Sequence, residues 1–235
     1  MKTVKYTGDA TSLYVLGDTH LGHPNTDLKK LQRHIDMIRH SDLPWVHLGD
    51  WVDAISADDR RFSIADHRMS VVESYLDMEE LFNPIAHQCE GILRGNHGSK
   101  WSKQEGDMIS VIARRWGIPY LGYQGFLIFN KTKMFMHHGA GGGRKRGAKT
   151  IRLNEWSQFV EADLYLQGHT HTYVQFTDEL VTATRKKIRH YANVPGYIDS
   201  YKGHDNYVEE WGLPPQPTGM LQLTLGDKIK IEPIL

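Results

Sequence analysis

The sequence predicts an α/β sandwich in which part of the sheet is antiparallel. Helical and strand-like segments alternate through the first two thirds of the 235 residues, and closely spaced strand-like segments dominate the end. Short polar motifs follow the apolar runs, and in such folds ligands bind beyond the carboxyl ends of the parallel strands. Because no repeat or linker divides the chain, we expect a single domain over residues 1–235.

Short runs of apolar residues mark the expected strands, and apolar residues at helical spacing mark the expected helices. The strands are predicted at residues 12–16, 44–48, 91–94, 126–130, 133–137, 162–166, 173–176, 188–192, 220–225 and 228–231. The first helix is expected to follow a cap at Asn25 or Thr26 and to run to about His40. The other helices are predicted at residues 64–82, 104–116 and 150–160.

The composition excludes several classes of protein. Lys and Arg total 28 and Asp and Glu total 28, so the net charge is zero. No overall electrostatic field therefore attracts the chain to nucleic acid or to a membrane. The single cysteine, Cys89, excludes an internal disulfide, and no apolar run approaches the about 18 residues of a membrane span. We therefore expect a cytoplasmic protein without a membrane partner. The 14 histidines are unusually many and suggest metal binding.

Five short motifs contain the candidate functional residues, and each follows an apolar strand-like run and includes a glycine. In the first, a carboxylate and an imidazole stand two residues apart, so in extended chain both face the same side. Any one of these motifs is a weak signal, but five in series are hard to obtain by chance. They are Gly17-Asp18-Thr19-His20, Gly49-Asp50-Trp51-Val52-Asp53, Gly95-Asn96-His97, His137-His138-Gly139 and Gly168-His169-Thr170-His171.

The donor atoms in these motifs suit divalent transition metals. Imidazole, carboxylate and amide oxygen bind Mn, Fe, Zn, Co or Ni, and we expect manganese first among them. Seven donors with one shared carboxylate are too many for one tetrahedral ion and suit two ions about 3.5–4 Å apart. A structural zinc site is excluded, because such sites use mainly Cys together with His.

In this order, the five motifs resemble those of the calcineurin-like metallophosphoesterase superfamily. The resemblance implies a four-layer α/β/β/α sandwich with two mixed sheets flanked by helices. It also implies a binuclear centre whose bridging hydroxide attacks the phosphoester in line, without a covalent intermediate. By the resemblance, one ion would be held by Asp18, His20, Asp50 and His171, and the second by Asp50, Asn96, His138 and His169.

The resemblance assigns His97 a role other than metal ligand. In the superfamily this position contacts the phosphate and is a candidate proton donor to the leaving group, and Asp53 would orient it. His137 and His138 are adjacent, so they face opposite ways in extended chain and only one should point at the metals. In the superfamily the metal ligand usually directly precedes the glycine, which favours His138.

Two features bear on the substrate. Related Ser/Thr protein phosphatases carry Arg-Gly and Glu where this chain has Ala54-Ile55 and Gly98, which argues against that activity. A glycine-rich loop after Gly139 offers an anion-binding nest with four cations. These candidate phosphate-binding residues are Arg144, Lys145, Arg146 and Lys149.

The favoured function is a phosphodiesterase or nuclease acting on nucleic acid or a nucleotide. The alternatives are a phosphomonoesterase acting on a small metabolite or phosphoprotein, and a catalytically silent scaffold of the same fold. The sequence leaves the native metal, endo- or exo-action and the oligomeric state open.

For Trp51, Trp101 and Tyr123 we expect buried packing rather than base stacking. The helical histidines are expected to face solvent, namely His34, His40, His67 and His87.

Overall fold

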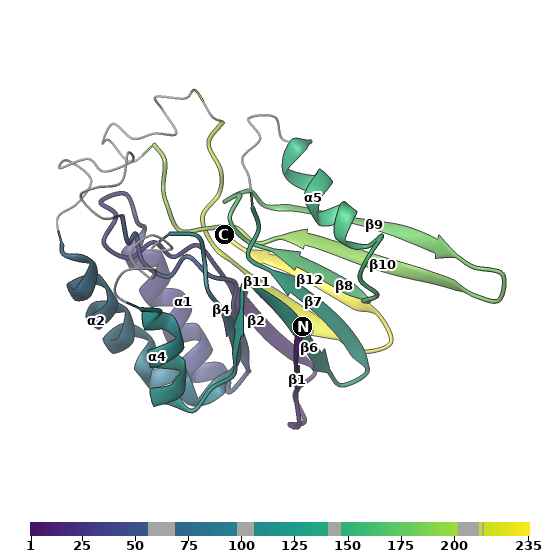
Figure 1. Cartoon of the computed structure of the whole chain (residues 1–235), viewed down its shortest axis with the longest axis horizontal. Helices are drawn as coiled ribbons and strands as arrows, with labels where there is room; N and C mark the ends of the chain where they lie inside the picture. Colours follow the sequence, from purple (N-terminus) through teal and green to yellow (C-terminus); the bar gives the residue numbers. More distant parts are fainter. Residues whose placement is uncertain (56–68, 98–105, 141–146, 202–211, 213) are drawn as a thin grey trace.

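The computed structural model describes residues 1–55, 69–97, 106–140, 147–201, 212 and 214–235. Within these ranges, two six-stranded sheets lie face to face, and helices cover the two outer faces (Figure 1). The strand orders are β12-β11-β2-β3-β4-β5 in one sheet and β1-β6-β7-β8-β10-β9 in the other. Both sheets mix parallel and antiparallel pairs, which confirms the predicted four-layer sandwich.

The first sheet has a parallel half and an antiparallel half. Its parallel strands are β2 (Ser12–Leu16), β3 (Trp45–His47), β4 (Cys89–Leu93) and β5 (Tyr120–Gly122). On the other side of β2, the chain's last hairpin adds β11 (Met220–Leu225) and β12 (Ile229–Ile234) in antiparallel register. The parallel strands therefore end at the same edge, where the first three motifs follow them.

The second sheet contains the strands that lead to the fourth and fifth motifs. β7 and β8 pair in parallel, so these two motifs also leave their strands at a common edge. A long hairpin of β9 and β10 extends away from the rest of this sheet (Figure 1). The strands are β1 (Lys2–Lys5), β6 (Gln124–Phe129), β7 (Thr132–His137), β8 (Leu164–Gln167), β9 (Val174–Val181) and β10 (Lys186–Asn193).

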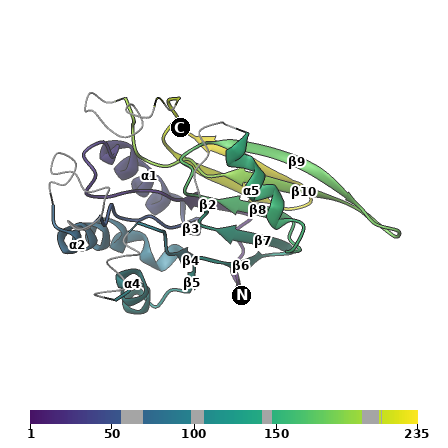
Figure 2. The ribbon, with the colours of Figure 1, turned by 45° about the horizontal axis from the view of Figure 1, so that its top comes forward.

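Helices are divided between the two outer faces (Figure 2). Three helices and a 3-10 segment cover the first sheet: α1 (Leu28–Ser41), α2 (Val71–Phe82), η1 (Asn83–Gln88) and α4 (Met108–Trp116). The second sheet is covered by α5 (Ala148–Trp156). No helix in the described ranges is long and apolar enough to cross a membrane.

Three apolar clusters hold the layers together, and alternating strand residues separate them. In β2, Val15 joins the cluster between the sheets, whereas Leu16 joins the cluster under the helices, and both are fully buried. A third, smaller cluster packs Leu153 of α5 onto Phe135 and Tyr165. Burial on both faces explains why the parallel strands are continuous apolar runs.

The helix starts differ from those predicted. Asp27 caps α1, since its side chain accepts from the Lys30 amide, whereas the Thr26 hydroxyl donates to the carbonyl of His20. A capping box of Ser70 and Glu73 begins α2, so residues 69 and 70 are not helical as predicted, and residues 64–68 lie outside the described residues. Asp107 caps α4 as Asp27 caps α1, since its side chain accepts from the Ser110 amide.

Candidate metal centre

The five motifs converge at the edge where β2, β3, β4, β7 and β8 end. Within the described residues, three groups of His and Asp side chains place their ligand atoms within 4.8 Å of one another. The groups share members, since His20 and Asp50 each belong to two of them. They are Asp18, His20 and His171; His20, Asp50 and His97; and Asp50, His138 and His169.

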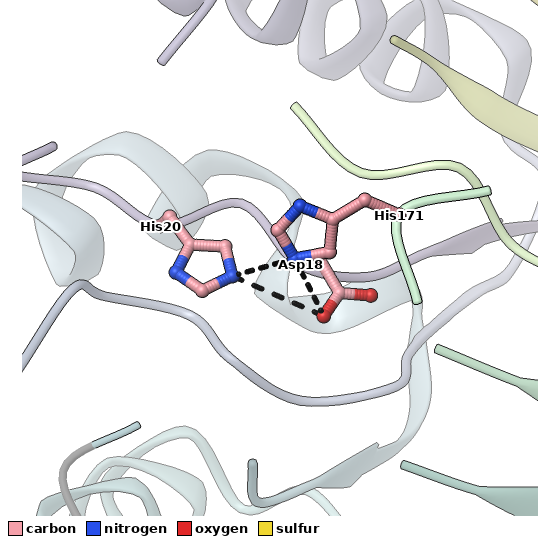
Figure 3. A group of neighbouring side chains, drawn as sticks. All are labelled: Asp18, His20 and His171. Atoms are coloured by element: carbon pink, nitrogen blue, oxygen red, sulfur yellow. Dashed lines mark hydrogen bonds and ion pairs between the residues drawn. The ribbon is translucent and has the colours of Figure 1, made fainter. Parts of the chain in front are cut away.

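In the first group, two imidazoles and a carboxylate point toward one another (Figure 3). The Nε2 atoms of His20 and His171 are 3.0 Å apart. Asp18 Oδ1 lies 3.5 Å from His171 Nε2 and 3.9 Å from His20 Nε2. Both Asp18 oxygens also accept from the His169 amide, at 2.9 and 2.8 Å, which ties the first motif to the fifth.

The other candidate ligands surround Asp50. His138 Nε2 lies 3.2 Å from Asp50 Oδ2 and 2.9 Å from Asn96 Oδ1. The His169 ring is 5.3 Å from the His138 ring, centroid to centroid. The structure therefore brings all seven predicted ligands into one cluster, with Asp50 between its two parts.

The adjacent histidines of the fourth motif face opposite ways. His138 is fully buried, and its Nδ1 hydrogen is donated to the carbonyl of Leu48 at 2.7 Å, so that Nε2 faces Asp50 and Asn96. His137 instead packs on Trp156, 4.8 Å between ring centroids, and its Nδ1 accepts from the Gly139 amide. Of the two, only His138 points into the cluster.

The arrangement of lone pairs fits bound cations. The Nδ1 hydrogens of His20 and His138 are directed at Asp53 and Leu48, so both Nε2 atoms face other acceptors. Asp50 Oδ1 accepts from the His97 amide at 2.8 Å, but buried Asp50 Oδ2 accepts no hydrogen bond in the described part of the chain. A buried acceptor left without a donor is costly, and a divalent cation would satisfy it.

The charge states also suit metal binding. Burial raises the pKa of Asp50, but the neighbouring charges of His138 and His97 outweigh burial and hold that pKa well below its ordinary value. Burial and the charge of His97 lower the pKa of His20 to about 4, which leaves this imidazole neutral. Burial opposes charge on His138, yet the Asp50 carboxylate raises its pKa to about 9. A cation would compete with that proton.

His97 lies at the edge of the cluster that solvent reaches, and Asp53 contacts it from the buried side. The Nδ1 hydrogen of His97 is donated to Asp53 Oδ1 at 2.7 Å, and the same oxygen lies 3.4 Å from His20 Nδ1. The His97 side chain is 20% exposed, whereas those of Asp53 and His20 are buried. His97 can therefore meet a substrate while Asp53 fixes its ring, the arrangement that the resemblance implies.

The backbone at the cluster is strained. Five candidate ligands have positive φ between 43° and 65°, a region that non-glycine residues rarely adopt. Such conformations persist only where surrounding contacts enforce them, and they gather at functional sites. The five residues are Asp18, His20, Asp50, His169 and His171.

Two glycines allow close approach to the ligands. A Cβ on Gly95 would lie 1.8 Å from Asp50 Oδ1, and a Cβ on Gly196 would lie 3.0 Å from Asp18 Cβ and 3.1 Å from His171 Cγ. Gly196, which follows β10, therefore forms part of the wall of the site. The Tyr197 amide, which donates to the carbonyl of Asp18, adds to this wall.

The sequence analysis missed a buried supporting residue, His47. Its Nδ1 accepts from the Gly49 amide at 3.1 Å, and its ring stacks on Trp51 with 3.6 Å between centroids. Nε2 lies 3.4 Å from the Thr19 hydroxyl, which connects the first two motifs behind the ligands. A polar residue inside the apolar run before Gly49 was the signal that could have identified it.

Of the four predicted phosphate-binding residues, only Lys149 is described, and it lies in the first turn of α5 rather than in a loop as predicted. Arg144, Lys145 and Arg146 lie outside the described residues. Lys149 Nζ donates to the carbonyl of Thr170 at 3.2 Å and to the Thr172 hydroxyl at 2.6 Å. Thr170 separates the candidate ligands of the fifth motif, so this ammonium group is close to the cluster.

Trp51 and His34 are buried, whereas Tyr123 is not. Trp51 is 2% exposed, as expected, but Tyr123 is 44% exposed, so buried packing was the wrong expectation there. His34 was expected to face solvent, but it is buried, and its Nδ1 faces the Tyr197 hydroxyl at 2.8 Å. His40 and His87 are exposed, and Trp101 and His67 lie outside the described residues.

Comparison with known proteins supports the fold at low sequence identity. No family model matches the sequence, and no curated protein matches it. A double mutant of Vps29 from Entamoeba histolytica is 13% identical with a TM-score of 0.51, over 95% of this chain and 98% of that one. The phosphoesterase Yfce from E. coli is 18% identical, with a TM-score of 0.49 over 90% of this chain and 87% of its own.

A third similar structure is a metallophosphoesterase from Sphaerobacter thermophilus. It is 12% identical with a TM-score of 0.45, over 95% of this chain and 88% of that one. The Vps29 match and the observed strand orders show the fold. The chain has the calcineurin-like phosphoesterase fold, which confirms the fold that the resemblance of the five motifs implies.

Proposed function

We propose that the protein is a divalent-metal-dependent phosphoester hydrolase whose favoured substrate is a phosphodiester, in a nucleic acid strand or a nucleotide. The observation that carries this proposal is the convergence of the motifs on Asp50. This carboxylate belongs to two of the three ligand groups and keeps one buried oxygen without a donor in the described residues. A carboxylate between two sets of ligands is what a binuclear centre requires.

Two cations would divide the ligands between them. Asp50 would be shared, Asp18, His20 and His171 would complete one set, and Asn96, His138 and His169 the other. When bound, such cations offset the negative charge of the phosphate and lower the pKa of water. Asp53 and the carbonyl of Leu48 orient His20 and His138, so that the Nε2 atoms face the centre.

His97 is the candidate proton donor. Its Nδ1 hydrogen is directed at Asp53, so Nε2 is the atom that would hold the proton that the leaving oxygen needs. Water would attack the phosphorus in line and release one proton to solvent, while the P–O bond to the leaving group breaks and that oxygen takes the proton from His97. His97 would then regain a proton from solvent. No covalent enzyme intermediate is required.

The preference for a diester rests on positive charge beside the cluster. Lys149 lies next to the fifth motif, and the sequence has three further cations at residues 144–146. A substrate with more than one phosphate would gain from this charge, whereas a small monoester would gain less.

The test is a substrate panel with purified protein and Mn²⁺. Bis(4-nitrophenyl) phosphate and single- and double-stranded DNA represent diesters, and 4-nitrophenyl phosphate represents monoesters. We expect diester cleavage that EDTA abolishes, that Asp50→Ala removes, and that the exposed control Asp36→Ala keeps. Cleavage of the monoester alone would contradict the diester preference. Absence of any hydrolysis would contradict the proposal that the protein is an enzyme and would favour a catalytically silent scaffold.

A further inference from the structure

Tyr123 is a large aromatic side chain that remains exposed next to the candidate metal centre. It is 44% exposed, and its carbonyl accepts from the amide of the candidate ligand His138 at 2.9 Å. Trp51, the other described aromatic that we had considered for stacking, is buried at 2% exposure. Burial in the core therefore does not explain the position of Tyr123.

Arg94 provides the second part of the same surface. Its guanidinium carbon lies 4.9 Å from the centroid of the Tyr123 ring, a cation–π arrangement. Arg94 directly precedes the Gly95-Asn96-His97 motif, and its amide donates to the carbonyl of Gly122 at 2.8 Å. Both residues are therefore fixed by backbone bonds to segments that lead into the ligand cluster.

The guanidinium is held in place from its other side. Asp107 Oδ2 lies 3.4 Å from the Arg94 guanidinium and also accepts from the Tyr120 hydroxyl. Asp107 caps α4, so this carboxylate is itself anchored by secondary structure. An arginine fixed in this way forms a rigid stack with the Tyr123 ring, and extending that stack with a planar ligand costs little conformational entropy.

We propose that Tyr123 and Arg94 form a stacking site for the aromatic part of the substrate, with a nucleobase as the chemical class that fits best. The site rests on the proposed function, because the phosphate of the same ligand would occupy the metal centre. A planar base stacks on tyrosine whatever its hydrogen-bonding pattern, so the site favours nucleotides without selecting one base. Such stacking is expected to tighten binding about tenfold.

The experiment compares two ligands that differ only in the base, together with inorganic phosphate as a test of the phosphate site alone. AMP, ribose 5-phosphate and inorganic phosphate are titrated calorimetrically into the Mn²⁺-loaded protein, so that the readout is independent of turnover. We expect AMP to bind the wild type about tenfold more tightly than ribose 5-phosphate. Tyr123→Ala should remove this preference and Tyr123→Phe should keep it. Phe159→Ala, which removes an aromatic that is 81% exposed outside this site, should also keep it.

The outcomes separate this site from the function on which it rests. Equal binding of AMP and ribose 5-phosphate by the wild type would overturn the stacking site alone. A preference for AMP that survives Tyr123→Ala would do the same. Failure of inorganic phosphate to bind the Mn²⁺-loaded wild type would overturn the proposed function, and the stacking site with it.

Discussion

His97 combines partial exposure with a fixed ring. Its Nδ1 hydrogen is held by Asp53 at 2.7 Å, and the side chain is 20% exposed. A proton donor matters most when the leaving oxygen is strongly basic. We therefore expect His97→Ala to reduce kcat about 100-fold or more for alkyl leaving groups, and far less for 4-nitrophenolate.

The measurement is kcat for a series of diesters that differ in the pKa of the leaving group. His87→Ala, at an exposed histidine of η1, is the matched control and should leave the series unchanged. Equal losses for good and poor leaving groups would leave His97 only an electrostatic role.

Gly95 makes room for the shared carboxylate. A Cβ at this position would lie 1.8 Å from Asp50 Oδ1 and 2.2 Å from the Asp50 amide nitrogen, so Asp50 must shift. We expect Gly95→Ala to destabilise the fold by about 1–3 kcal/mol and to weaken Mn²⁺ binding at both sites. Calorimetric titration and urea unfolding measure the two effects.

The control for that change is Gly226→Ala, where an added Cβ meets nothing within 4 Å. It should change neither Mn²⁺ binding nor stability by more than about 0.5 kcal/mol. Unchanged metal affinity in Gly95→Ala would show that Asp50 does not need its observed position.

The candidate ligands could be predicted from the sequence because each belongs to a short motif that includes a glycine and follows an apolar run. The left-handed backbones of five of them could not be predicted, because surrounding contacts impose those conformations and they contradict residue preference. His47 was also beyond prediction as part of the site. Its role depends on contact with Thr19, which lies far away in the sequence.

At the scale of elements, α1 is connected to the wall of the candidate site. His34 of α1 faces the Tyr197 hydroxyl, and the Tyr197 amide donates to the carbonyl of Asp18. Burial lowers the pKa of His34 from 6.5 to about 4, with smaller effects of Lys30 and Arg33. The folded state therefore resists a proton that the unfolded chain accepts.

This pKa shift predicts a pH dependence of stability. The contribution of His34 is fully present above pH 6.5 and is lost as the pH falls toward 4. We expect the loss of unfolding free energy between pH 7 and pH 5 to be about 1 kcal/mol smaller in His34→Gln than in the wild type.

Urea unfolding at both pH values, with EDTA present in each sample, measures this difference. His40→Gln, at an exposed histidine of the same helix, is the control and should behave as the wild type. An identical pH dependence in His34→Gln and the wild type would show that His34 is not protected from protonation.

Strongly apolar strands were predicted well, whereas some short strands and the second half of β9 (Val174–Val181) were missed. β2 and β11 have the predicted bounds, because their apolar runs end sharply. β1 and β5 were missed, because four residues with the sequence Lys-Thr-Val-Lys and three residues at a sheet edge carry little periodicity. Side-chain capping bonds, which several residues could have made, decided where α1 and α2 begin.

At the scale of the whole molecule, the two sheets place strands from both halves of the chain against one another. β2, β3 and β4 lead to the first three motifs in one sheet, and β7 and β8 lead to the last two in the other. The cluster therefore forms only when the sheets are packed. Cations bound there would stabilise the packed state by mass action.

The number of bound ions tests the central claim most directly. Chelated protein is reloaded with Mn²⁺, and the metal content per chain is measured by mass spectrometry after dialysis. The account predicts two ions per chain for the wild type, at most one for Asp18→Ala and none for Asp50→Ala. Fewer than one ion in the wild type, or two retained in Asp50→Ala, would contradict it.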